Sequence, residues 1–133
     1  MAVSKEVKLF IIRQLGIKQT AYKDALKKMQ EALFKLEGYL VTSVYHIASD
    51  ERLKKGYLDD VATMETIYNE FIDIKKKYKD AIDQYFFVEG FSTNKKDNEL
   101  KDDVKNDAKS IKERKQAIYA IRDFILEQEN QLG

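Results

Sequence analysis

Apolar residues recur along this chain at alternating steps of four and three positions, the spacing that places side chains on one face of an α-helix. The clearest run consists of Tyr22, Leu26, Met29, Leu33, Leu36, Leu40, Ser43 and Ile47. A second run consists of Tyr57, Val61, Met64, Tyr68, Phe71, Lys75, Tyr78, Ile82 and Tyr85. A third, sparser run extends from Leu100 to Leu132. These runs predict three long helices, at about 20–48, 57–88 and 98–130.

A short helix is predicted before the first long one, at about 5–15. Ser4 is a suitable N-cap for it, and Gly16 stands where a C-terminal cap belongs. Thr20 is then the predicted N-cap of the next helix. The sequence therefore predicts an interruption of the helix between 15 and 20.

Proline and glycine are the residues that most often interrupt a helix, and the chain contains no proline and only five glycines. A few long helices are therefore expected, without further short elements between them. Long helices joined by short polar turns run antiparallel to their neighbours. We therefore expect an all-α protein, an elongated antiparallel bundle of three long helices with a short N-terminal helix, forming a single domain over 1–133. A four-helix arrangement completed by another chain fits the same apolar faces.

Composition removes most kinds of catalytic site. The chain has 133 residues, no cysteine and one histidine, and its glycines do not form a phosphate-binding loop. Metal sites inside helical bundles need several His and Glu ligands, and His46 stands alone. The acidic pairs of the second long helix are interpreted as a solvent-facing surface. We predict no enzymatic activity, no cofactor and no metal.

The only early apolar run, Leu9–Ile12, is shorter than a signal peptide or a spanning helix requires. We therefore expect a soluble protein without a signal peptide and without a membrane partner. Its location stays open between the cytoplasm and a virion or other assembly.

Charge is balanced overall, with a formal net charge of +1, but it is unevenly distributed. Residues 1–56 contain 11 basic and 6 acidic residues. The densest basic cluster, Lys75, Lys76, Lys77 and Lys79, surrounds Tyr78, a combination that binders of single-stranded nucleic acid use. Acidic residues flank this cluster and can pair with it along the helix. Nucleic acid is therefore the less favoured partner.

Aromatic residues gather where the second long helix is expected to end. Phe86 and Phe87 are consecutive, so their side chains point about 100° apart and cannot both face one core. The outward one is either covered by the first helix or the 88–99 loop, or is free to bind a partner. The candidate docking residues are Phe10, Ile11, Phe86, Phe87 and Phe91.

Taken together, these features predict a non-enzymatic structural or interaction protein. It would be a subunit or adaptor of a larger protein assembly, such as a viral or mobile-element structural component, binding a protein partner or further copies of itself. The alternative is a small nucleic-acid-associated regulator that uses the basic N-terminal third.

Overall fold

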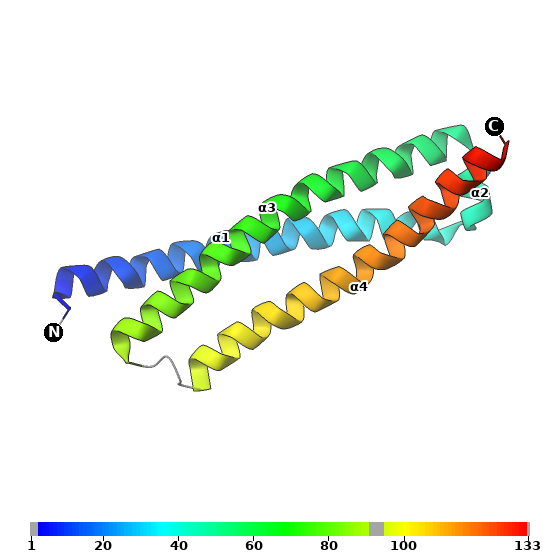
Figure 1. Ribbon diagram of the computed structural model, residues 1–133. Helices are drawn as coiled ribbons and strands as arrows, with labels where there is room; N and C mark the ends of the chain where they lie inside the picture. Colours follow the sequence, from blue (N-terminus) through cyan, green and yellow to red (C-terminus); the bar gives the residue numbers. More distant parts are fainter. Residues whose placement is uncertain (1–2, 91–94, 133) are drawn as a thin grey trace. The chain divides into compact units, whose positions relative to one another are not determined.

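The computed structural model describes the backbone of residues 3–90 and 95–132, with side chains for 3–90 and 96–128, and shows four α-helices there and no strand. The helices are α1 (Lys5–Gly38), α2 (Val44–Ser49), α3 (Glu51–Glu89) and α4 (Lys95–Leu132), with a 3₁₀ turn, η1 (Tyr39–Val41), after α1 (Figure 1). The prediction of an all-α bundle with three long helices is confirmed.

The predicted interruption near Gly16 is wrong, because α1 is continuous from Lys5 to Gly38. Ser4 does cap its start, since its hydroxyl accepts a hydrogen bond from the Val7 backbone amide at 3.3 Å. Thr20 is not an N-cap; its hydroxyl donates to the Gly16 carbonyl at 3.1 Å inside the helix. A glycine in open space and a threonine bonded to the preceding turn both fit a helix interior.

The first long helix ends earlier than predicted, at Gly38 rather than near residue 48. Ser43, expected on the apolar face, is instead the N-cap of the short α2 and accepts from the His46 amide at 3.1 Å. The next turn holds Asp50, whose carboxylate accepts from the amides of Arg52 and Leu53 and so starts α3. Helix α3 therefore includes Gly56 and begins six residues before the predicted start at 57.

The chain divides into two compact units, each of which contains a part of all three long helices. Unit 1 consists of Met1–Lys27 and Glu70–Ala108, and unit 2 consists of Lys28–Asn69 and Lys109–Gly133. In both units α3 runs antiparallel to α1 and α4, as predicted. The prediction of a single domain stays a prediction.

The core of unit 1 contains stacked and tilted aromatic rings. Tyr22 of α1 stacks on Tyr78 of α3 with ring centroids 4.9 Å apart, and it also contacts Phe71 at 5.8 Å. This core also contains Ile82 of α3 and Val104 of α4. Burial of such side chains stabilises a domain by about 1.5–3 kcal/mol each.

The core of unit 2 is built by fully buried residues from all its helices. They are Met29, Leu33, Leu36, Ile47, Tyr57, Met64, Ile111, Ile118 and Ile125, together with the nearly buried Val61. Tyr57 also meets the edge of the Tyr39 ring at 5.3 Å. Gly56 permits this approach, because a Cβ atom there would lie 2.8 Å from the Tyr39 hydroxyl.

Candidate functional site

The structure separates the five candidate docking residues into core and surface. The Phe87 side chain is 80% exposed and that of Phe10 is 58% exposed, whereas Ile11 and Phe86 are 5% and 3% exposed. Phe91 lies outside the described residues. Phe86 packs its edge on Tyr85, with ring centroids 4.8 Å apart. Ile11 and Phe86 therefore belong to the core of unit 1, and Phe10 and Phe87 can contact a partner.

The antiparallel packing of α1 and α3 in unit 1 brings Phe10 and Phe87 to the same end. Gln19 Nε2 donates to the Tyr78 hydroxyl at 3.3 Å and fixes the register of the two helices. Phe10 lies nine residues before Gln19 in α1, and Phe87 lies nine residues after Tyr78 in α3. Both helices rise equally per residue, so these two exposed rings come from neighbouring turns. The same count places the buried Ile11 opposite Phe86.

Other apolar side chains on the early turns of α1 are exposed as well. We call them, with the two phenylalanines, the end surface: Val7, Leu9, Phe10, Ile12, Ile17 and Phe87. By the same register, α3 ends at Glu89 opposite Lys8, so only residues 5–7 of α1, less than one turn, lie beyond it. Helices whose apolar residues surround the axis normally have neighbours on all sides.

Charged residues at this end oppose the dipoles of their own helices. Lys5 and Lys8 lie at the start of α1, where the helix N-terminus disfavours positive charge, although Glu6 partly offsets them. The end of α3 carries Asp83 and Glu89 and no base in its last turn.

The four predicted lysines do not act as one patch. Lys75 and Lys79 of α3 line a groove of about 650 Å³ together with Lys101 and Lys105 of α4. The pKa of Lys75 is lowered by burial and, secondly, by the charge of Lys79. Lys76 and Lys77 do not line this groove. Lys77 pairs with Asp73 at 3.0 Å, and Lys76 is exposed.

Acidic residues neutralise part of this groove. Lys101 Nζ lies 2.6 Å from Asp83 and 3.4 Å from Asp97, and hydrogen bonding to Asp83 raises its pKa. Asp97 is fully buried in the first turn of α4, where Lys101 compensates its charge but no hydrogen bond reaches its oxygens among the described residues. The pairing of Lys101 with Asp83 was not predicted, since these two residues lie on different helices.

A second groove in unit 1, of about 520 Å³, lies beside two buried tyrosines. The Tyr22 hydroxyl donates to Asp107 Oδ2 at 2.7 Å. Burial raises the pKa of Tyr22 above its ordinary value, and the bond to Asp107 raises it further. Burial also raises the pKa of Tyr78. Both phenols therefore stay protonated at neutral pH and act as packing and hydrogen-bonding groups.

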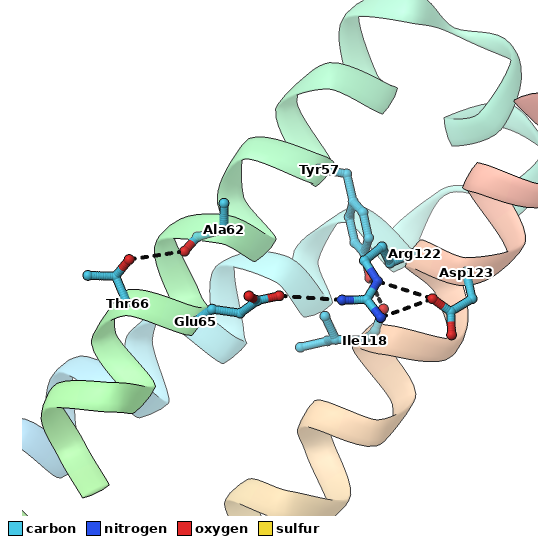
Figure 2. A network of polar contacts seen from close by, with 7 residues as sticks. All are labelled: Tyr57, Ala62, Glu65, Thr66, Ile118, Arg122 and Asp123. Carbon is cyan, nitrogen blue, oxygen red and sulfur yellow. Dashed lines mark hydrogen bonds and ion pairs between the residues drawn. The ribbon is translucent and has the colours of Figure 1, made fainter. Parts of the chain in front are cut away.

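Unit 2 holds the most connected polar contacts between α3 and α4 (Figure 2). Arg122 reaches Glu65 at 3.4 Å and Asp123 at 3.0 Å, and its guanidinium lies 4.4 Å from the Tyr119 ring centre. The buried Tyr57 hydroxyl donates to the Ile118 carbonyl at 2.8 Å. Burial raises the pKa of Tyr57, and the Arg122 charge opposes part of that shift. Each polar group has a partner, so the network fastens α3 to α4.

Two structural findings concern metals and membranes. Among the side chains of residues 3–90 and 96–128, no three His, Cys, Asp or Glu are grouped so that they could hold a metal ion. No helix in these ranges is long and apolar enough to cross a membrane.

Comparison of the chain with models of protein families, with curated proteins and with solved structures finds no match. The function must therefore be argued from the surface itself.

Proposed function

We propose that this chain is a non-enzymatic structural or interaction protein, a helical subunit or adaptor that joins a larger protein assembly through its end surface. The observation that carries the proposal is the exposure of six large apolar side chains at one end of unit 1, with Phe87 at 80%. Single exposed apolar residues are ordinary, but a group of them from two helices marks an interaction surface.

The chemistry of the end surface agrees with protein binding. Interface centres are enriched in aromatic side chains and are bordered by polar and charged residues. Phe10 and Phe87 supply the aromatic rings, and Lys8 and Arg13 supply exposed charges nearby. A viral or mobile-element structural component is one setting in which such a subunit would work.

The test compares two phenylalanines of similar exposure in different units. Phe87→Ser alters the end surface, while Phe34→Ser alters a side chain of unit 2 that is 76% exposed. Tagged forms of both variants and of the wild type are expressed in the organism that encodes the chain, and co-purifying proteins are quantified by mass spectrometry.

We expect one protein, or untagged copies of this chain, to co-purify with the wild type and with Phe34→Ser but not with Phe87→Ser. All three forms should unfold with free energies within about 0.5 kcal/mol of each other, since the altered residues lie on the surface. Identical partner sets for all three forms would contradict the proposal, as would a wild type with no partner above background.

Binding of nucleic acid phosphates is a second candidate function, favoured by the groove that Lys75, Lys79, Lys101 and Lys105 line. The pairing of Lys101 with two aspartates argues against it. Retention on single-stranded DNA that falls steeply between low and moderate salt would support this function. Lys75→Gln with Lys79→Gln should then weaken retention more than Lys76→Gln, which alters an exposed lysine outside the groove lining. Equal retention of these variants would contradict it.

A further inference from the structure

We propose that a second copy of this chain covers the end surface. In this arrangement the start of α1 of one copy lies along the end of α3 of the other, and the same contact is repeated in the opposite direction. The inference rests on the proposed function and names its partner.

The two segments are complementary in charge. Residues 5–18 of α1 contain four basic residues and one acidic residue, a net charge of +3. Residues 80–89 of α3 contain three acidic residues and no basic residue, a net charge of −3. Opposite charges on facing surfaces speed association and fix the relative position of two partners. One copy therefore presents both halves of a matched pair.

Most of these charged side chains form no ion pair within the described parts of the chain. In the described parts of unit 1, none of Lys5, Lys8 and Arg13 forms an ion pair. The same holds there for Asp80 and Glu89, while Asp83 pairs with Lys101. Several of these charges also oppose the dipole of the helix that carries them. A second copy would supply the partners that the single chain lacks.

The apolar residues are distributed between the same two segments. Val7, Leu9, Phe10, Ile12 and Ile17 belong to α1, and Phe87 belongs to α3. Each complementary segment thus combines apolar side chains with one sign of charge. Burying Phe87 of one copy against the α1 residues of the other would remove both from water, which is the main favourable term in association.

Both halves of the pair belong to unit 1, and the register of α1 and α3 places them at the same end of it. A two-fold axis beside this end brings each positive segment onto a negative one, so both contacts form together. Such a self-complementary interface closes at two copies, the commonest symmetry of soluble oligomers. The structure therefore favours a dimer over an open chain of copies.

Charge reversal provides a direct test. Lys8→Glu with Arg13→Glu makes the α1 segment acidic, and Asp80→Lys with Glu89→Lys makes the α3 segment basic. Each double variant alone repels its own copies at both contacts, but a mixture of the two restores opposite charges at both. Lys27→Glu with Lys76→Glu is the matched control, because it changes the same amount of charge at exposed residues outside both segments.

Light scattering coupled to size exclusion measures the outcome for purified protein. We expect a dimer for the wild type and the control, dissociation constants raised about tenfold or more for each charge variant alone, and a one-to-one dimer on mixing. Failure of the mixture to restore the dimer, or equal weakening by the control, would overturn the inference.

A monomeric wild type would overturn the inference irrespective of how the variants fold. It would leave the proposed function standing if another protein still co-purified in a Phe87-dependent way. Absence of both self-association and any such partner would remove the inference and the proposed function together.

Discussion

At the scale of single residues, two glycines on this chain have opposite roles although the sequence presents them alike. Gly16 lies inside α1 with no atom near the place a Cβ would occupy. Gly90 follows α3 with a φ of 73°, a left-handed conformation that side chains disfavour. The sequence pointed to Gly16 as a helix end because glycine is favoured just after a helix and disfavoured inside one. Whether the surroundings of Gly16 tolerate a continuous helix cannot be read from the apolar pattern.

This difference predicts opposite effects of the same substitution. Gly16→Ala should raise the free energy of unfolding by about 0.5–1 kcal/mol, since alanine is the better helix former and meets no neighbour. Gly90→Ala should lower it by about 1 kcal/mol, the cost of a left-handed alanine. Urea unfolding monitored by circular dichroism measures both. A loss of stability with Gly16→Ala would mean that α1 is interrupted where the sequence suggested.

The tyrosines predict how stability changes at high pH. Burial raises the pKa of Tyr39 to about 12, aided by its 2.8 Å hydrogen bond to Asp60, and burial also raises the pKa values of Tyr22, Tyr57, Tyr78 and Tyr119. The unfolded chain releases these protons near pH 10, and the folded chain holds them longer. The contribution of Tyr39 to stability is therefore complete below pH 10 and is lost as the pH rises through 12, and the contributions of the other four are also lost as the pH rises above 10.

Parallel titrations by tyrosinate absorbance and circular dichroism check this expectation. These five tyrosines should ionise at a higher pH in the folded chain than in the unfolded chain. Their ionisation near pH 10 in a chain that remains helical would show that they are not buried as described.

At the scale of elements, the apolar pattern predicted the buried faces better than the helix ends. Met29, Leu33 and Leu36 are fully buried as expected, but the same periodic run continues to Leu40, which is exposed. The chain leaves the helix at Gly38, and Ser43 then begins α2. Periodicity could not reveal this helix end, because a serine in an apolar run can be either an N-cap or a small residue on the apolar face.

Neighbouring residues of α1 test the register of its buried face. Leu36→Ala should lower the free energy of unfolding by about 2–5 kcal/mol, because it leaves a cavity at a fully buried site. Phe34→Ala, two residues away and 76% exposed, should change it by about 0.5 kcal/mol or less. Comparable effects of both substitutions on denaturant midpoints would show that the face of α1 is assigned wrongly.

The ends of the helices also decide which part of the candidate site was predictable. The rule that consecutive phenylalanines diverge predicted that one of Phe86 and Phe87 would be outward, and Phe87 is the exposed one. The exposure of Leu9 and Ile17 was not predicted, because it depends on which side of α1 faces the neighbouring helices, and no local pattern gives this. Likewise, the groove between Lys75 and Lys105 joins lysines of two helices that no local pattern relates.

At the scale of the whole molecule, the two units have different surfaces. Unit 1 carries the end surface and the lysine-lined groove, while unit 2 contains the closely paired network of Glu65, Arg122 and Asp123. Unit 2 also pairs Glu37 with Arg114 and Lys35 with Asp60 across its helices. Exposed charges without an ion pair among the described residues occur in both units, for example Lys8 in unit 1 and Lys109 in unit 2. Unit 2 also exposes Val41, Phe34 and Tyr45, at 90%, 76% and 73%, so the comparison of Phe87 with Phe34 decides whether association belongs to the end surface.

The most direct test of this account is the solution mass of three forms of the chain, measured by light scattering over a hundredfold range of concentration. We expect that the wild type and Phe34→Ser exceed the 15.6 kDa of one chain as concentration rises, and that Phe87→Ser stays near that mass. Equal masses for Phe87→Ser and Phe34→Ser at every concentration would contradict the claim that the end surface of unit 1 holds copies of this protein together.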